Sequence, residues 1–279
     1  MSEYHPLARK WRPNKFSSFV GQDLVVNALS YALDNNSVHH AYLFTGTRGV
    51  GKTSIGRLLA KCLNCETGVG SNPCNKCSAC LSIDQGNFID LIEIDAASKT
   101  KVEDTRELID NIQYAPSAGK YKVYLIDEVH MLSAHSFNAL LKTLEEPPPH
   151  VKFILATTDP QKLPETILSR AMGFNLREIS IADIQGHLAK VLTEEKIKFN
   201  LDALLLIAQC ARGSMRDALT LTDRIIANGA GEVDLTLAQD VLGVASESLV
   251  LKILEMIFTG NGVGLIDSLH SDFDDCLDF

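Results

Sequence analysis

The feature that most constrains the fold is the octapeptide GTRGVGKT over Gly46–Thr53, which fits the pattern GxxxxGK[ST]. It follows a short apolar run, Ala41–Thr45, and leads into a helical pattern over Ser54–Leu63. At such a strand-to-helix turn, backbone N–H groups and the positive end of the helix dipole point at phosphate oxygens. A chance match in a glycine-rich turn is the alternative, and the flanking strand and helix argue against it. The octapeptide therefore predicts a nucleotide-binding site.

Individual residues of the octapeptide have separate expected roles. We expect Lys52 to reach the β and γ phosphates of ATP and the Thr53 hydroxyl to bind Mg²⁺. The other members are expected to cradle the phosphates, chiefly through backbone groups: Gly46, Thr47, Arg48, Gly49, Val50 and Gly51.

Two acids follow the apolar run Lys122–Ile126, at the position where a parallel strand would end. Asp127 there is expected to supply a second Mg²⁺ contact. Its neighbour Glu128 is expected to polarise an attacking water. Taken alone, the pair could equally be two solvated acids in a turn, but the upstream phosphate loop favours the catalytic interpretation.

A pair of threonines, Thr157 and Thr158, ends another apolar run, Val151–Thr157. A hydroxyl at this strand end could orient the same water or touch the γ-phosphate. A β-branched residue that merely completes a strand is an equally good explanation.

The apolar runs alternate with helical patterns, which is typical of a parallel α/β sheet. A further strand is predicted over Asp90–Ile94, with helices over Val102–Tyr114 and Ala134–Leu144. From Ser180 to Val241 only helical periodicity is visible, as in Ala203–Cys210 and Arg216–Ile226. We therefore place a domain boundary near residue 179, and a helical stretch over 246–258 follows a second break at Gly243.

Cysteine usage predicts a metal site. The chain of 279 residues has seven cysteines, and five of them fall between Cys62 and Cys80. The spacing C-x8-C-x2-C-x2-C is typical of a structural tetrahedral Zn²⁺ site, and its members are Cys65, Cys74, Cys77 and Cys80. Cys62 competes for the first position, although a small buried helix residue is the better interpretation. An iron–sulfur cluster remains an alternative.

Charge and hydropathy exclude two classes of protein. The formal net charge of −9 argues against a protein that coats nucleic acid by bulk charge. No apolar run approaches the roughly 20 residues that span a bilayer. The polar, basic start Met1–Arg12 lacks the apolar stretch of a secretory signal, so a cytoplasmic location is expected.

Several long segments together resemble the bacterial DNA polymerase III gamma/tau subunit family, from residue 1 to about residue 243. They are LARKWRP (Leu7–Pro13), the phosphate loop, the four-cysteine module, DEVHML (Asp127–Leu132), LATTDPQKLPETILSR (Leu155–Arg170) and GSMRDAL (Gly213–Leu219).

The resemblance implies an AAA+ ATPase that works in a five-subunit clamp loader with delta and delta-prime subunits. Such assemblies open the sliding clamp and place it on primer–template DNA. The implied fold is a P-loop AAA+ parallel α/β sheet over 1–179, with a zinc module inserted at about 62–82. A small helical lid over 180–243 and the truncated start of a helical collar over 244–279 would follow. No set of polymerase carboxylates is visible, so a polymerase label would come only from the holoenzyme.

The resemblance also implies roles for several residues. By position, Arg170 resembles the arginine finger that acts on ATP held by a neighbouring subunit, and Arg216 resembles the sensor-2 arginine. Thr158 resembles sensor 1, and Thr157 could assist it. The segment packed near the adenine would contain Arg9, Trp11, Arg12 and Pro13. One departure is Ala171, where the family usually has cysteine. Without the resemblance, Arg170 could be a surface loop residue and Arg216 a helix salt-bridge partner.

A short basic segment is a candidate for DNA contact. Cations and hydroxyls at the start of a predicted helix can bind a phosphate backbone without reading bases, and here they are Ser98, Lys99, Thr100, Lys101 and Arg106. In the family this region faces the duplex. The neighbouring acids Glu103, Asp104 and Glu107 favour a solvated capping segment instead.

Three functions fit the phosphate loop: an ATP-driven clamp-loader motor, a nucleotide-gated scaffold that hydrolyses little, and a small-molecule kinase. Glu128 argues against the scaffold, because a protein that does not hydrolyse ATP need not retain an acid there. The motif around Arg216 and the helical region fit a kinase poorly.

Overall fold

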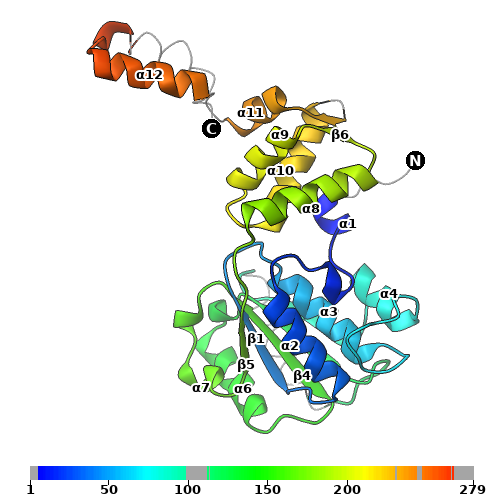
Figure 1. Ribbon diagram of the computed structural model, residues 1–279. Coiled ribbons are helices and arrows are strands. Elements are labelled where there is room, and N and C mark those ends of the chain that lie inside the picture. Colours follow the sequence, from blue (N-terminus) through cyan, green and yellow to red (C-terminus); the bar gives the residue numbers. More distant parts are fainter. Residues whose placement is uncertain are drawn as a thin grey trace.

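A five-stranded parallel sheet forms the core of the lower lobe in the computed structural model, which describes residues 6–98, 112, 114–229, 231–243, 247–264 and 266 (Figure 1). The strand order is β2-β3-β4-β1-β5, and all neighbours run parallel. The strands are β1 (Ala41–Thr45), β2 (Leu91–Asp95), β3 (Lys122–Asp127), β4 (Val151–Thr157) and β5 (Met172–Asn175). The predicted parallel α/β sheet is thus confirmed.

The edge strand β5 was not predicted from the sequence. It has only four residues, one of them glycine, and Met172 at its start is 47% exposed. Such a short, half-exposed segment carries neither the alternation nor the apolar run that indicates a strand. Pairing with β1 defines it, with Leu43 opposite Gly173 and Phe44 opposite Phe174.

Helices cover both faces of the sheet, and alternate strand residues serve the two faces. One buried core contains Tyr42 and Phe44 with side chains of α2 (Asp23–Asp34) and α3 (Lys52–Asn64). The opposite core contains Ala41 and Leu43 with side chains of α6 and α7. The remaining helical elements of this region are α1 (Leu7–Lys10), η1 (Phe16–Ser18), α4 (Ser78–Gln85), η4 (Val129–Met131), α6 (Ala134–Glu145), η5 (Pro160–Lys162) and α7 (Glu165–Leu168).

The predicted helices over 54–63 and 134–144 are confirmed as α3 and α6. The α6 helix starts where Ser133 caps it by accepting a hydrogen bond from the Ser136 N–H at 3.2 Å. The helix expected over 102–114 lies almost entirely outside the described residues.

A helical group follows the sheet: α8 (Ile181–Glu194), α9 (Leu201–Cys210), α10 (Met215–Asn228) and α11 (Leu235–Leu242). Each helix begins at a polar side chain that accepts a backbone N–H, namely Ser180, Asn200, Ser214 and Asp234. The expectation of helices alone was incomplete, because β6 (Lys198–Phe199) and β7 (Glu232–Val233) pair as a small parallel sheet. Strands of two residues are too short to show a period of their own.

The N-terminal segment packs against this helical group although the sheet lies between them in sequence. Leu7 belongs to the same buried core as Ile184 and Leu204, and its N–H donates to Asp223 Oδ2 at 2.8 Å. The Trp11 indole donates to Glu195 Oε1 at 2.8 Å. These contacts tie residues 7–11 to α8 and α10, and the domain division near residue 179 stays a prediction.

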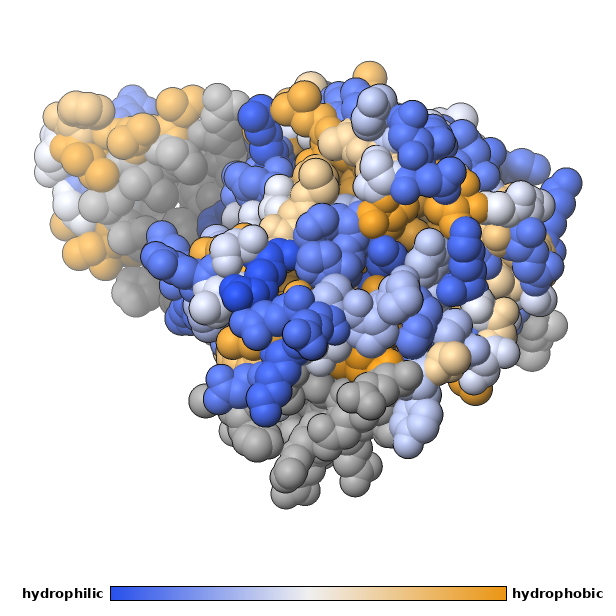
Figure 2. All heavy atoms as spheres, turned by 90° about the horizontal axis from the view of Figure 1, so that it is seen from below, coloured by the Kyte–Doolittle hydropathy of each residue, from blue (hydrophilic) through white to orange (hydrophobic). Residues whose placement is uncertain are grey.

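The α12 helix (Glu247–Thr259) stands apart from α8–α11 in Figure 1. Several of its apolar side chains are exposed, and its apolar atoms gather at the left of the face shown in Figure 2. The exposed apolar side chains of α12 include Leu251, Leu254, Ile257 and Phe258. Within the described part of the chain, no helix combines the length and hydropathy needed to cross a bilayer.

Two helical glycines provide a matched test of how tightly α3 packs on the sheet. A Cβ at Gly56 of α3 would lie 2.7 Å from Leu125 Cδ1 and 2.9 Å from Ile154 Cγ2, whereas one at Gly186 of α8 would meet nothing within 4 Å. We expect Gly56→Val to lower the free energy of unfolding by about 2 kcal/mol through overpacking. Gly186→Val should change it by less than about 0.5 kcal/mol. Equal effects in chemical denaturation would contradict close packing at Gly56.

Candidate functional site

The phosphate loop joins β1 to α3 and depends on glycine at several positions. Gly46 has φ 138°, Gly49 φ 80° and Gly51 φ 105°, a region that L side chains rarely adopt. A Cβ at Gly46 would lie 2.5 Å from the Leu176 carbonyl oxygen, and one at Gly49 would lie 1.8 Å from Ser214 Oγ. The loop is therefore pressed between the segment after β5 and the start of α10, which places it between the sheet and the helical group.

Lys52 lies in the first turn of α3 with its ammonium turned back over the loop. Its Nζ donates to the carbonyl oxygens of Gly46 and Thr47, each at 2.8 Å. Burial lowers the Lys52 pKa, while the charges of Glu128 and Asp127 act in the opposite direction. A phosphate at the loop amides would give this ammonium a charged acceptor in place of two neutral carbonyls.

Thr53 and Asp127 meet across the gap between α3 and the end of β3. The Thr53 hydroxyl donates to Asp127 Oδ2 at 2.6 Å, and Asp127 Oδ1 accepts the Glu128 N–H at 3.0 Å. A hydroxyl and a carboxylate this close provide the oxygen ligands that Mg²⁺ takes beside nucleotide phosphates. The structure thus brings together the two residues for which a shared Mg²⁺ was expected.

Glu128 lies beside the end of β4. Its backbone has φ 47°, a conformation uncommon for a residue other than glycine. Its Oε2 accepts two hydrogen bonds from Thr158, from the N–H at 3.0 Å and from the hydroxyl at 2.8 Å. Because β3 and β4 are parallel neighbours, Glu128 after β3 and Thr158 after β4 meet at the carboxyl ends of the strands.

His130 also belongs to this cluster, although no role was predicted for it from the sequence. It lies in η4 with Nδ1 2.8 Å from Thr157 Oγ1 and 3.4 Å from Glu128 Oε2. Its position just after the two acids in the segment DEVH was the only local hint of its involvement.

The two arginines with expected roles lie in different places. The Arg216 N–H, at the start of α10, donates to the Gly49 carbonyl oxygen at 3.4 Å, so this residue adjoins the phosphate loop. Arg170 lies just before β5 and forms an ion pair with Glu145 at 2.9 Å. The strands β1 and β5 run parallel, and Arg170 precedes β5 whereas the phosphate loop follows β1. Arg170 therefore lies at the opposite end of the strands from the loop.

A cavity of about 540 Å³ lies between the N-terminal segment, α3 and the C-terminal end of α4. Of the segment expected near the adenine, Arg9, Arg12 and Pro13 line this cavity, whereas the Trp11 indole bonds to Glu195. Burial lowers the Arg12 pKa, and the neighbouring positive charges of Arg57, Arg216 and Arg9 add to that effect, opposed by Glu93. The wall of this cavity thus concentrates positive charge near the phosphate loop.

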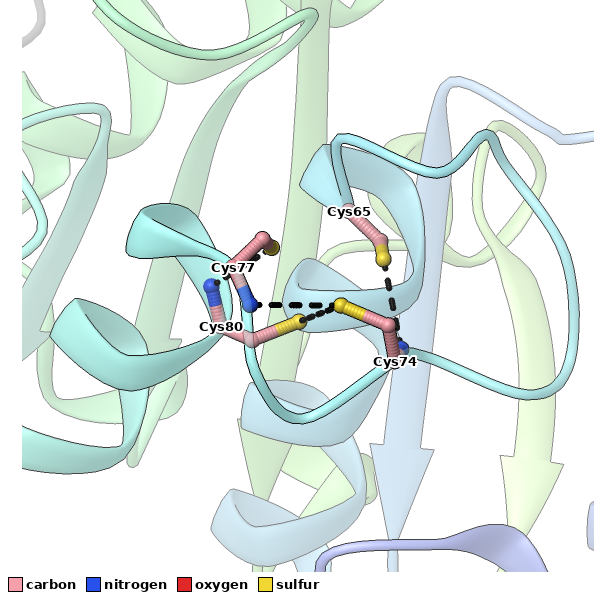
Figure 3. A group of neighbouring side chains, drawn as sticks. All are labelled: Cys65, Cys74, Cys77 and Cys80. Carbon is pink, nitrogen blue, oxygen red and sulfur yellow. Dashed lines mark hydrogen bonds between the residues drawn. The ribbon is translucent and has the colours of Figure 1, made fainter.

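The four cysteines of the predicted module converge at the ends of α3 and α4 (Figure 3). Their sulfur atoms all lie within 4.8 Å of one another, and Cys74 Sγ is 3.9 Å from Cys80 Sγ. Tetrahedral Zn²⁺ with Zn–S bonds of about 2.3 Å requires sulfurs about 3.8 Å apart, a spacing that the Cys74–Cys80 pair matches and that the rest of the group approaches. Cys62 is outside the group, buried in the core beneath α3, with its thiol 3.8 Å from the Ser71 carbonyl oxygen.

Backbone amides favour thiolates at two of these cysteines. Burial alone would raise the Cys65 pKa, but hydrogen bonds to its sulfur from Cys74 and Thr67 outweigh burial and lower it to about 6. The N–H groups of Lys76 and Cys77 lower the Cys74 pKa. Burial raises the pKa of Cys80, where a bound dication would supply the missing opposite charge.

The expected DNA-contacting residues Lys99, Thr100, Lys101 and Arg106 lie outside the described residues. Ser98 is described, and its hydroxyl donates to the Asp95 carbonyl oxygen at 3.1 Å.

Two family models match the chain. One, described as "DNA polymerase III, delta subunit", matches residues 21–180. The other, described as "DNA polymerase III clamp loader subunit, ATPase lid domain", matches residues 183–231.

Curated relatives match nearly the whole chain. The DNA polymerase III subunit tau of Escherichia coli (strain K12) is 59% identical over 93% of this chain and 40% of its own length. The DNA polymerase III subunit gamma of Buchnera aphidicola subsp. Baizongia pistaciae is 49% identical over 98% of this chain and 76% of its own. The chain spans about two fifths of the first relatives it matches, 40% in the Escherichia coli case.

Among solved structures, Thermotoga maritima RuvB, a Holliday junction branch migration motor, superposes with a TM-score of 0.60 at 19% identity. The superposition covers 88% of this chain and 79% of that one. At this identity the likeness concerns the fold.

The cysteine geometry predicts which thiols hold a metal. Native mass spectrometry should find one thiophilic divalent ion per chain in the wild type and in Cys62→Ala. It should find none, or a weakly held one, in Cys74→Ser, because the fourth thiolate of a closed site is lost. Loss of the ion from Cys62→Ala with retention in Cys74→Ser would instead make Cys62 a ligand.

Proposed function

This chain belongs to the bacterial DNA polymerase III gamma/tau family, and we propose on that basis that it is an ATP-hydrolysing motor of the clamp loader. In this role it loads the sliding clamp onto primed DNA during replication. The family model described as "DNA polymerase III, delta subunit" matches residues 21–180 only, whereas the tau subunit of Escherichia coli and the gamma subunit of Buchnera aphidicola subsp. Baizongia pistaciae match 93% and 98% of the chain.

The observation that carries the proposal is the meeting of Lys52, Thr53, Asp127 and Glu128 at one end of the sheet. The amides of the phosphate loop bind the phosphates, and Lys52 leaves its two carbonyl acceptors for the β and γ phosphates. Thr53 and Asp127 would supply oxygen ligands to Mg²⁺. When bound, that ion offsets charge on the phosphate oxygens.

Glu128 and Thr158 act on the attacking water. Glu128 polarises the water, and Thr158, already hydrogen-bonded to Glu128 Oε2, senses the γ-phosphate as sensor 1 with Thr157 beside it. Arg216 contacts the γ-phosphate of its own subunit, which its backbone contact with Gly49 supports. The Arg9–Pro13 segment packs near the adenine.

Arg170 acts as an arginine finger in a neighbouring subunit. Arg170 lies at the amino end of β5, whereas the phosphate loop of the same chain follows the carboxyl end of β1. This separation supports a role at the loop of another chain. The Glu145 ion pair is exposed, so leaving it costs little.

Partners follow from the family: delta and delta-prime subunits, further gamma/tau copies, the sliding clamp and primer–template DNA in the cytoplasm. The exposed apolar residues of α12 fit the start of a helical collar that packs against other subunits. DNA contact falls to the backbone-binding segment with Lys99, Thr100, Lys101 and Arg106. Zn²⁺ at the four cysteines is structural, and any polymerase activity belongs to the holoenzyme.

Glu128→Gln tests the role of the acid. In the full-length protein assembled with its partner subunits, clamp and primed DNA, we expect ATP turnover to fall by at least about 100-fold because the general base is lost. Affinity for Mg·ATP should stay within about twofold, since the phosphate loop is intact. The control Glu194→Gln, on the exposed face of α8, should match the wild type. Wild-type turnover by Glu128→Gln would remove the basis of the motor.

Mixed assemblies test whether Arg170 acts between subunits. Arg170→Ala and Glu128→Gln should each abolish most turnover alone, the former by about 1,000-fold as for other arginine fingers. Mixing the two variants should restore turnover in part, because some interfaces then pair an intact Glu128 with an intact Arg170. An arginine acting within its own chain would show no such recovery.

A further inference from the structure

We propose that His130 is a positioning residue for Glu128. The buried hydroxyl of Thr157 holds the imidazole of His130, and the imidazole in turn orients the catalytic carboxylate of Glu128. The inference rests on the proposed ATPase function and adds a residue to that site.

The geometry joins Glu128 and His130, from the segment after β3, to Thr157 at the end of the neighbouring strand β4. The His130 side chain is 9% exposed, and its Nδ1 lies 2.8 Å from Thr157 Oγ1 and 3.4 Å from Glu128 Oε2. Thr157 is fully buried, and its Oγ1 also accepts the Asp159 N–H at 3.1 Å. The His130 imidazole is thus held by the buried Thr157 hydroxyl and also faces the Glu128 carboxylate.

Among the described residues, the side-chain contacts of Glu128 all reach the same oxygen. Glu128 Oε2 accepts the Thr158 N–H and hydroxyl and adjoins His130 Nδ1. This arrangement leaves Oε1 to take a proton from water, which is the orientation a general base requires.

The contact of His130 with the Glu128 carboxylate is one for which a bound nucleotide would not compete. The Thr158 hydroxyl is the group proposed to turn toward the γ-phosphate, and when it does so Glu128 loses one of its hydrogen bonds. The Thr158 N–H and His130 then remain to hold the carboxylate. Since Thr157 is fixed by the Asp159 amide, His130 keeps its place through that exchange.

The proposal requires a proton on His130 Nδ1. A carboxylate only accepts hydrogen bonds, so an unprotonated Nδ1 would present its lone pair to Glu128. Thr157 Oγ1 has two lone pairs and can accept both the Asp159 amide and the Nδ1–H. With the proton on Nδ1, the same N–H bonds Thr157 and attracts Oε2.

The test compares His130→Ala, His130→Asn and His130→Gln in the full-length protein assembled with partner subunits, clamp and primed DNA. His130→Ala should lower kcat by about tenfold or more, as expected for a misplaced catalytic group. KM and the affinity for Mg·ATP should stay within about twofold. His130→Asn, whose amide can occupy the Nδ1 position, should restore most of kcat, whereas the longer His130→Gln should not.

Thr157→Val provides an independent arm. It removes the hydroxyl that holds the imidazole, so kcat should fall by a similar factor. The double variant with His130→Ala should be no slower than the worse single variant, since both break one connection.

The outcomes separate this inference from the proposed function. If Glu128→Gln abolishes turnover while all three His130 variants keep wild-type kcat, His130 has no positioning role and the motor stands. Equal kcat for His130→Asn and His130→Gln overturns the inference even if His130→Ala does not fold. Wild-type turnover by Glu128→Gln overturns both proposals.

Discussion

The hydrogen bond between Thr53 and Asp127 joins the first turn of α3 to the end of β3, and the rest of the site is arranged around it. It can form because α3 lies directly on the sheet, where Gly56 lets the helix approach Leu125 and Ile154 closely. Parallel strands then bring their carboxyl ends to the same edge, so that Glu128 reaches the end of β4. The chemistry of the site therefore depends on the packing of one helix.

The same helix links the phosphate loop to the cysteine module. The α3 helix starts at Lys52 and ends at Asn64, immediately before Cys65. Near its end, the almost fully buried Lys61 forms an ion pair with Asp84 of α4, and a buried cation of this kind needs such a partner. The loop between Cys65 and Cys74 is tied to α2, because Asp34 accepts hydrogen bonds from the N–H and hydroxyl of Ser71, at 2.8 and 2.9 Å. A metal at the cysteines would hold α4 against α3 and so brace the helix that carries the loop.

The parts of the molecule that sequence could predict are those with local physical requirements. The phosphate loop is readable because its turn needs glycines at positive φ, and the four cysteines because a metal fixes their spacing. The contact of His130 with Thr157 spans 27 residues and depends on how β3 and β4 align, which no local pattern encodes. The packing of Leu7 among helices far along the chain is hidden for the same reason. The edge strand β5 was missed because a neighbour, not its own residues, makes it a strand.

The polarity of the sheet also limits how copies of this chain can share a site. The phosphate loop follows the carboxyl ends of the parallel strands, whereas Arg170 precedes β5 at their amino ends, so the proposed role of Arg170 would give each chain two different half-sites on two different surfaces. A contact that brings Arg170 of one copy to the loop of the next is heterologous, because it pairs unlike surfaces. Contacts of that kind do not close as two-fold dimers and continue into a ring or a spiral. The proposed role of Arg170 between copies therefore implies a ring-like or helical assembly, not a symmetric pair.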